Sequence, residues 1–427
     1  MKDLYFRDKK EIEEEQFALL RKQLLYIAEH SPFYQLIFRE RGVDISKIES
    51  FDDLRTIPIT TKEDLQRFNE DFIAVPKAEI IDLVTTSGTL GSPVSFALND
   101  ADLDRLAENE QRSFEIAGVT SKDIVQITTT LDRRFMAGMA YFIGLRKMGA
   151  GIIRTGSGLP KLQWESIQRF QPTVLVAVPS FLLKLIDYAV KNKIDIQNSP
   201  VKKAICIGEP LRSGDGGLNA LGKKITEKWE IELFSTYAST EMATAFTECE
   251  FHKGNHVLSD LIYTEIVDEQ GREVAPGETG ELVVTPLGVQ TMPLVRFATG
   301  DMLTFTNSAC ECGRNTKKLG PVIGRKQQKL KLKGTSIYPQ HIIEALNSYG
   351  KLESFLIEAS HDELSNDKLK ILIPDTLQSA EIESLKEHFK SELHVTPDFE
   401  KIPLEEINSI RFPKTSRKPQ VFKDLRN

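Results

Sequence analysis

Leucine and isoleucine side chains recur at helical spacing near the start of the chain. They are Leu19, Leu20, Leu24, Leu25 and Ile27. The spacing predicts a helix over residues 12–29. Ser31 precedes Pro32, and a residue before proline disfavours helical backbone, so we expect the helix to end there.

Beyond residue 80, short β-rich runs alternate with amphipathic stretches. The runs predict strands at residues 80–85, 124–129, 151–155, 173–178 and 203–207. The amphipathic stretches predict helices at residues 101–116, 162–170, 180–191 and 217–229. Alternation at this spacing is typical of parallel βαβ units, so this part of the chain predicts an α/β fold.

A strand-rich region follows, with predicted strands at residues 261–267, 280–285 and 302–306, two of them separated by a tight turn at 276–280. A boundary is expected near residues 324–327, where a second pattern begins. It comprises a Lys-rich strand at 329–333, a helix after Pro339, strands at 354–358 and 369–373 and a helix at 379–393. We therefore expect a large N-terminal domain, residues 1–326, and a small α+β C-terminal domain, residues 327–427.

Composition narrows the functional classes. The 427 residues are 40% hydrophobic and 27% charged, as in ordinary globular proteins, and the net charge is −7. An acidic balance argues against a nucleic-acid partner. The chain has no apolar run of membrane-spanning length, and its charged N-terminus lacks the apolar stretch of a signal peptide. We therefore expect a cytoplasmic protein with no membrane or nucleic-acid partner, and a homodimer stays open.

One polar segment has the composition of a phosphate-binding loop. Residues 85–93 read Thr-Thr-Ser-Gly-Thr-Leu-Gly-Ser-Pro and follow a predicted strand. Glycines allow positive φ, and successive N–H groups with hydroxyls form an anion-binding nest. An ordinary hydrophilic turn is the alternative. A Walker-type loop is excluded because the Gly-Lys-Ser/Thr ending is absent.

This segment resembles the phosphate loop of the adenylate-forming enzymes, the acyl- and aryl-coenzyme A ligases, although Leu90 and Val94 depart from the usual Thr and Lys. Further segments resemble phenylacetate–coenzyme A ligases and follow in that family's order. They are HSPFYQLIFRERGVD, DLRTIPITTKEDL, CIGEP (206–210), STYASTE (235–241), GETGELVVTPL, MPLVRFATGD (292–301), GRKQQKLKLKG (324–334) and FPKTSRKPQ (412–420). The resemblance implies the adenylate-forming fold with a mobile C-terminal domain.

The resemblance also implies roles for individual residues. Glu241 would hold Mg²⁺, a hard ion suited to carboxylate oxygen, and Thr240 would bind the α-phosphate of ATP. Lys418 would bridge the substrate carboxylate and the α-phosphate. The remaining implied nucleotide contacts are Ser87, Gly88, Thr89 and Gly91 in the phosphate loop, Gly208, Glu209, Pro210 and Tyr237 around adenine, Asp301 on the ribose and Arg325 behind it.

Two further sites follow from the same resemblance. Gln327 stands where the family has a hinge Asp or Lys, about which the C-terminal domain would turn between two half-reactions. The acyl pocket would be built from the apolar, aromatic segment 135–142, which fits an aryl or arylacetic acid. Its candidate residues are Phe135, Met136, Gly138 and Tyr141. The start of a core helix is an equally good interpretation of that segment from periodicity alone.

Three cysteines and a histidine form a separate set. Cys249, His256, Cys310 and Cys312 would complete a tetrahedral structural Zn²⁺ site, with His252 as a competing ligand. Unligated thiols with a surface His are the alternative, and short members of the phenylacetate-ligase family show a similar pattern. Cys206 is expected to be a small buried apolar residue.

The resemblance therefore implies an AMP-forming carboxylate–coenzyme A ligase with a small-molecule acid, ATP and coenzyme A as partners. Mg²⁺ and a structural Zn²⁺ are its expected metals. Three alternatives stay open: adenylyl transfer without coenzyme A, loading of a carrier protein, and a nucleotide-binding subunit without catalysis.

Overall fold

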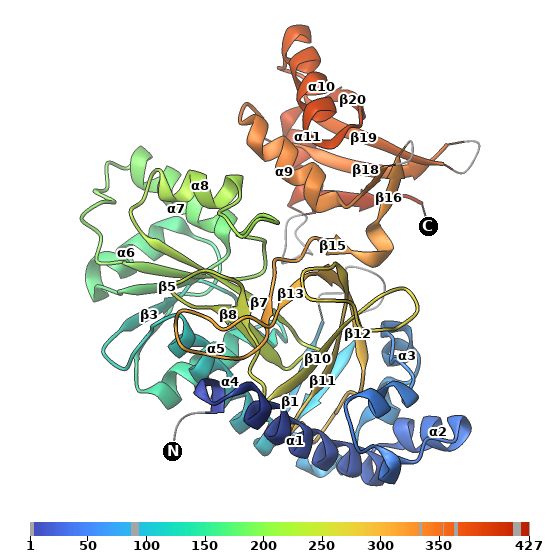
Figure 1. Ribbon diagram of the computed structural model, residues 1–427. Coiled ribbons are helices and arrows are strands. Elements are labelled where there is room, and N and C mark those ends of the chain that lie inside the picture. The colour runs from blue at the N-terminus through green and yellow to red at the C-terminus, as the bar shows by residue number, and fades with distance from the viewer. Residues whose placement is uncertain are drawn as a thin grey trace. The chain divides into compact units, whose positions relative to one another are not determined.

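The computed structural model describes residues 4–86, 94–332, 335–352, 354–362, 366–412 and 420–426 (Figure 1). The chain divides into two compact units. The first comprises Met1–Thr299 and Leu303–Val322, and the second comprises Gly300–Met302 and Ile323–Asn427. The expected boundary between 326 and 327 stays a prediction, and each unit is described by itself.

The predicted N-terminal helix is confirmed as α1 (Lys9–His30). Asp8 caps its start by accepting a hydrogen bond from the Glu11 N–H, which satisfies one free donor of the first turn. Pro32 then opens α2 (Pro32–Arg41), where its fixed φ suits the first helical position. Leu25 is the exception to the expected apolar face, since it is 57% exposed.

A nine-stranded sheet forms the centre of the first unit, in the order β13-β14-β9-β8-β7-β6-β5-β3-β4. Neighbouring strands pair in parallel among β3, β4, β5, β6 and β7. They pair antiparallel among β7, β8, β9, β14 and β13. The strands are β3 (Ile124–Ile127), β4 (Gly151–Arg154), β5 (Val174–Ala177), β6 (Lys203–Cys206), β7 (Glu232–Ser239), β8 (Thr244–Glu248), β9 (Asn255–His256), β13 (Phe305–Thr306) and β14 (Lys318–Leu319).

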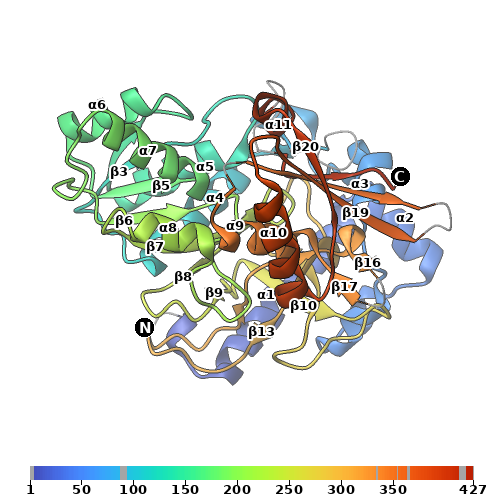
Figure 2. The same ribbon diagram turned by 90° about the horizontal axis from the view of Figure 1, so that it is seen from above.

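Helices cover both faces of the parallel half (Figures 1 and 2). They are α4 (Asp100–Ile116), α5 (Met136–Met148), α6 (Pro160–Phe170), α7 (Pro179–Lys191) and α8 (Ala220–Thr226). Val174 and Val176 of β5 pack with α4 and α5, while Leu175 and Ala177 pack with α6, α7 and α8. This alternation follows from the period of two along a strand, and it confirms the predicted α/β fold.

Three predicted elements differ from those observed. The strand expected at residues 80–85 among the parallel βαβ units pairs antiparallel instead, in a two-stranded hairpin outside the nine-stranded sheet. The helix expected at residues 217–229 is the shorter α8, because Asn219 caps its start by accepting from Gly222 N–H. The strand expected at residues 302–306 is split at Thr304 between β12 (Phe297–Leu303) and β13.

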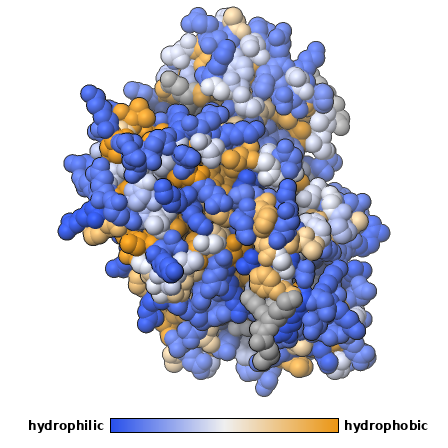
Figure 3. All heavy atoms as spheres, turned by 60° about the vertical axis from the view of Figure 1, so that its left-hand side comes forward, coloured by the Kyte–Doolittle hydropathy of each residue, from blue (hydrophilic) through white to orange (hydrophobic). Residues whose placement is uncertain are grey.

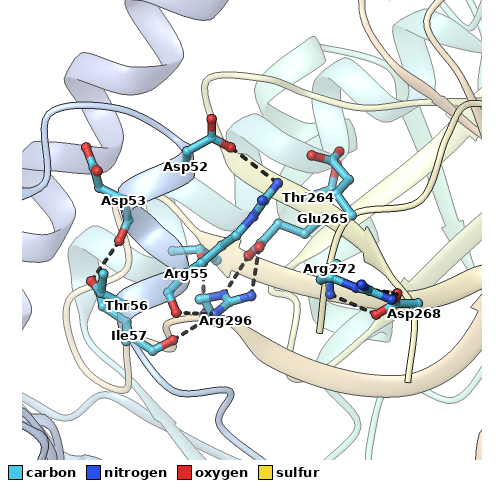
Figure 4. A network of polar contacts seen from close by, with 12 residues as sticks. Asp52, Asp53, Arg55, Thr56, Ile57, Thr264, Glu265, Asp268, Arg272 and Arg296 are labelled. Carbon is cyan, nitrogen blue, oxygen red and sulfur yellow. Dashed lines mark hydrogen bonds and ion pairs between the residues drawn. The ribbon is translucent and has the colours of Figure 1, made fainter. Parts of the chain in front are cut away.

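A second sheet contains the buried strands β10 (Ile262–Val267) and β11 (Gly280–Pro286), which pair antiparallel. Arg296 bonds both to Glu265 of this sheet and to the N-terminal segment around Ile57 (Figure 4). Its guanidinium forms a bidentate pair with Glu265, both bonds at 3.0 Å, and donates to the Ile57 carbonyl at 2.8 Å. A separate hairpin consists of β1 (Asp82–Thr85) and β2 (Ser95–Leu98).

The second unit is the α+β arrangement of its predicted elements. Its sheet has the order β20-β19-β18-β21. The elements are β15 (Gly324–Arg325), β16 (Leu330–Leu332), β17 (Thr335–Ile337), α9 (Pro339–Tyr349), β18 (Leu356–His361), β19 (Asp367–Pro374), α10 (Ser379–Leu393), β20 (Asp398–Ile402), α11 (Leu404–Arg411) and β21 (Phe422–Asp424). Apolar side chains of α9, α10, β18 and β19 form one core.

The face turned forward in Figure 3 is mostly hydrophilic, with separate apolar patches. Within the part of the chain that the structure describes, no helix is both long enough and apolar enough to cross a membrane.

Candidate active site

Thr240 and Glu241 lie in the turn between β7 and β8, at the carboxyl end of the last parallel strand. The Ala243 N–H donates to the Thr240 carbonyl at 3.2 Å, and Met242 N–H donates to Ser239 Oγ at 3.3 Å. These bonds close the turn. Polar side chains beyond the carboxyl ends of parallel strands are where open α/β sheets bind ligands.

Lys62 faces this turn from another part of the first unit. Its Nζ lies 3.5 Å from Glu241 Oε1, and the Glu241 side chain is only 10% exposed. Lys62 begins α3 (Lys62–Arg67), whose capping box joins Thr61 and Asp64. The sequence interpretation missed Lys62, although it stands in the quoted segment DLRTIPITTKEDL directly after a capping threonine.

A small cavity of about 20 Å³ lies behind the turn. Its polar lining includes Arg105, Thr240 and Glu241, and its apolar lining includes Leu98, Met136 and Met292. The structure therefore brings Met136, a candidate acyl-pocket residue, beside the two candidate catalytic residues.

The other candidate acyl-pocket residues have different surroundings. Phe135 is half-buried at the start of α5. Gly138 is buried, and a Cβ there would lie 2.1 Å from the Thr130 carbonyl oxygen, so only glycine fits. Tyr141 is 3% exposed and packs edge-on against Phe114, as a core residue does. Their contact with an acyl group stays a prediction.

The segment Gly208-Glu209-Pro210 follows β6, and Gly208 has a φ of 75°. The Glu209 carboxylate accepts hydrogen bonds from Ser180 N–H at 2.9 Å and Ser180 Oγ at 2.8 Å. It therefore caps the start of α7, where a negative charge is favourable. A contact between this segment and adenine would accordingly use its backbone rather than the Glu209 carboxylate.

Tyr237 lies on β7 with its ring stacked on Phe246, the centroids 5.9 Å apart. Cys206 at the end of β6 is 1% exposed, which confirms it as a buried residue.

Asp301 and Arg325 lie opposite each other in the second unit, on paired strands. Arg325 Nε lies 3.4 Å from Asp301 Oδ1. Gln327 follows in a short 3₁₀ helix, and its carbonyl accepts a hydrogen bond from Arg426 at 3.2 Å. The expected ribose-binding carboxylate and its supporting arginine are thus neighbours.

Several predicted residues lie outside the described ranges: Ser87, Gly88, Thr89, Gly91 and Lys418. The two residues that border the phosphate loop are described. Thr86 N–H donates to the Val94 carbonyl at 3.0 Å, and Val94 N–H donates to Thr86 Oγ1 at 3.1 Å.

The four predicted zinc ligands converge in the first unit. The ligand atoms of Cys249, His256, Cys310 and Cys312 all lie within 4.8 Å of one another. Cys249 Sγ and Cys310 Sγ are 3.6 Å apart, and Cys312 Sγ lies 3.6 Å from His256 Nε2. Two sulfurs bound to zinc at about 2.3 Å in a tetrahedron are about 3.8 Å apart. The donor set and its spacing therefore fit Zn²⁺.

The surroundings of this cluster favour the neutral imidazole that a metal needs. Burial, reinforced by Arg314 and Lys318, lowers the pKa of His256 to about 3. His256 Nδ1 lies 3.3 Å from Thr316 Oγ1, which leaves Nε2 facing the thiols. His252, the competing ligand, instead lies beside Glu248, with Nδ1 3.2 Å from Oε1.

Comparisons with known proteins show what this chain is similar to. A family model described as AMP-binding enzyme matches residues 29–293. The chain is 29% identical over 328 residues to a phenylacetate–coenzyme A ligase of Thermus thermophilus, covering 76% of this chain and 72% of that protein. It is 26% identical over 348 residues to the Escherichia coli phenylacetate–coenzyme A ligase, covering 80% and 77%.

Solved structures share the fold. A 2-hydroxyisobutyryl-CoA ligase in the postadenylation state, in complex with R3-HIB-AMP, has a TM-score of 0.84 at 23% identity, covering 99% of this chain and 91% of that chain. The same ligase with CoA in the thioesterification state has a TM-score of 0.72 at 25% identity, covering 99% and 92%. The expected adenylate-forming fold and the resemblance to phenylacetate–coenzyme A ligases are confirmed, and the chain belongs to the AMP-binding enzyme family.

Proposed function

We propose that this chain is an ATP-dependent carboxylate–coenzyme A ligase that works through an acyl-AMP intermediate. The carboxylate of the acid attacks the α-phosphorus of ATP and releases pyrophosphate. The thiol of coenzyme A then attacks the acyl carbon and releases AMP. The observation that carries the proposal is the Thr240–Glu241 turn, which adjoins Lys62 and Met136 in a chain of the AMP-binding enzyme family.

The charged groups at this turn suit the first step. The Thr240 hydroxyl would donate a hydrogen bond to the α-phosphate. The Glu241 carboxylate, largely buried, offers hard oxygens that fit Mg²⁺, which when bound would neutralise phosphate charge. The Lys62 ammonium lies 3.5 Å from the Glu241 carboxylate, so a cation and an anion would both face the triphosphate. Lys418 would stabilise charge on the reacting oxygens.

The composition of the cavity lining favours an apolar acid. Met136, Leu98 and Met292 surround the cavity beside Thr240, and Phe135 lies one residue away. These side chains offer apolar contact to an aryl or arylacetic group, as the names of the relatives in Thermus thermophilus and Escherichia coli suggest. The Asp301–Arg325 pair would bind the ribose of ATP, and Gln327 would be the hinge.

A structural zinc ion completes the proposal. Three thiolates and one imidazole leave no open coordination position, so the ion would hold the segments 249–256 and 310–312 together without entering the reaction. We place the enzyme in the cytoplasm, where free thiols persist.

Acid-dependent exchange of labelled pyrophosphate into ATP, measured over a panel of aryl, arylacetic and fatty acids, tests the proposal. We expect exchange that requires both Mg²⁺ and an aryl or arylacetic acid, and a thioester when coenzyme A is added. Exchange without a thioester would point to adenylyl transfer or to a carrier-protein acceptor. No exchange with any acid would contradict catalysis altogether.

A further inference from the structure

Arg105 places a buried positive charge behind the Thr240–Glu241 turn. The residue lies on α4 and is 9% exposed. Its guanidinium donates to the Ala243 carbonyl at 2.6 Å and to Thr244 Oγ1 at 3.1 Å. It also donates to the carbonyls of Leu287 and Leu261, each at 2.5 Å. One side chain thus joins the turn to the residue before β10 and the residue after β11.

None of these four hydrogen-bond acceptors is a carboxylate, although the nearby carboxylates of Asp102 and Asp260 favour the charged form of the guanidinium. Burial lowers the pKa of Arg105 to about 10, and the group remains cationic at neutral pH. A buried charge is costly, and an apolar side chain would fill the same space without that cost. Arginine offers something an apolar side chain does not, because its planar guanidinium holds several N–H donors in a fixed fork and bonds several acceptors at once.

The backbone of the turn is strained where Arg105 binds it, at Ala243. This residue has a φ of 45°, in the left-handed region that costs energy for a side chain other than glycine. Its N–H is held by the Thr240 carbonyl, and its own carbonyl is held by Arg105. Arg105 also lines the same small cavity as Thr240 and Glu241.

We propose that Arg105 is a positioning residue, which holds the strained Ala243 peptide so that Thr240 and Glu241 keep the orientation they need toward ATP and Mg²⁺. This inference rests on the roles proposed above for Thr240 and Glu241. Without the guanidinium, the turn relaxes at Ala243 and the Glu241 carboxylate loses its fixed direction. Residues that orient a metal ligand from behind typically matter by about 10–100-fold in metal affinity or activity.

The test compares Arg105→Lys with wild type in acid-dependent pyrophosphate exchange. Lysine keeps the charge but loses the fork of donors. We expect the exchange rate at saturating ATP and acid to fall about tenfold or more, and the Mg²⁺ concentration for half-maximal rate to rise about tenfold. Arg296→Lys is the matched control, because Arg296 is also buried and holds backbone carbonyls, in the network of Figure 4. It should lower the melting temperature without changing the Mg²⁺ dependence.

Ala243→Gly provides a second variant that leaves the arginine in place. Glycine adopts the observed φ without strain, so the melting temperature should change little, yet the looser turn should again raise the Mg²⁺ requirement. If Arg105→Lys does not fold, Arg105→Gln takes its place, because glutamine keeps two donors but loses the charge and the fork. Wild-type rate and Mg²⁺ dependence in the folded variants would overturn the inference, provided that Glu241→Gln raises the Mg²⁺ requirement. If Glu241→Gln also leaves it unchanged, the proposed role of Glu241 fails instead.

Discussion

Glu110 is a carboxylic acid buried on α4. It is 4% exposed, and Asn109 Nδ2 donates to its Oε1 at 3.1 Å. Burial raises its pKa to about 8, partly offset by the Asn109 hydrogen bond. The folded protein therefore binds this proton more tightly than the unfolded chain, and the stability gained at low pH is lost as pH rises toward 8.

Glu110→Gln should remove this pH dependence. The wild-type free energy of unfolding should fall by about 1–3 kcal/mol between pH 6 and pH 8.5, and the glutamine variant should lack most of that decrease. Urea unfolding at both pH values measures it. Glu115→Gln, an exposed position on the same helix, is the control and should keep the wild-type slope. An unchanged slope in Glu110→Gln would show that Glu110 is ionised in the folded protein.

Lys418 carries the prediction for the first half-reaction. Lys418→Ala should slow acyl-AMP formation by about 100-fold or more, since it removes a charge that stabilises the transition state. Thioester formation from supplied acyl-AMP should be largely retained. Lys370→Ala is the control, because the Lys370 ammonium is paired with Glu400 on the neighbouring strand, 2.8 Å away. Wild-type adenylation in Lys418→Ala would move the role to another lysine, Lys414 or Lys423.

At the scale of elements, the cysteine cluster joins two loops to the rest of the first unit. Cys249 and Cys310 pack in a core with Leu4, Tyr5 and Ile12 from the N-terminal segment. We expect one zinc ion per chain in protein purified without chelator. Cys310→Ser should lose the metal and lower the melting temperature by several degrees, while the KM for ATP changes little.

His252→Ala is the control for the zinc prediction. His252 lies in the same loop, but its partner is Glu248 rather than the cluster. Elemental analysis should find zinc retained in this variant and lost in Cys310→Ser. Absence of zinc from the wild-type protein would contradict the site.

The elements that the sequence predicted are those with a strong local signal. The βαβ alternation was readable because β5 is buried on both faces and helices such as α7 have one apolar face. The start of α8 could not be read from the apolar pattern, because the Asn219 cap places it at Ala220 rather than at residue 217. The metal cluster could be predicted from residue type, because three cysteines and a histidine are a typical set of zinc ligands.

Polar contacts between residues far apart in the chain could not be predicted from the hydrophobic pattern of the sequence. Lys62 and Glu241 are far apart in the chain, and nothing local indicates that their side chains meet. Arg105 sits in a stretch that reads as an amphipathic helix with a polar face, yet its guanidinium is buried. Burial of a charge depends on which carbonyls the fold brings to it, and these come from distant segments.

At the scale of the whole molecule, the resemblance implies that the second unit turns between the half-reactions. Gln327→Pro should keep acid-dependent pyrophosphate exchange and lose thioester formation, because proline fixes φ and removes a backbone donor at the hinge. Gln327→Ala is the control and should retain both steps. Loss of both steps in the proline variant would mean damage to the first conformation, and survival of both would place the pivot elsewhere.

The most direct test of the account is to trap the intermediate. Wild-type protein is mixed with Mg·ATP and an arylacetic acid without coenzyme A, quenched with acid, and the bound nucleotide is identified by mass spectrometry. We expect acyl-AMP with one pyrophosphate released per intermediate, and its conversion to thioester and AMP when coenzyme A is added before the quench. Formation of ADP and phosphate, or a thioester that appears without acyl-AMP, would contradict it.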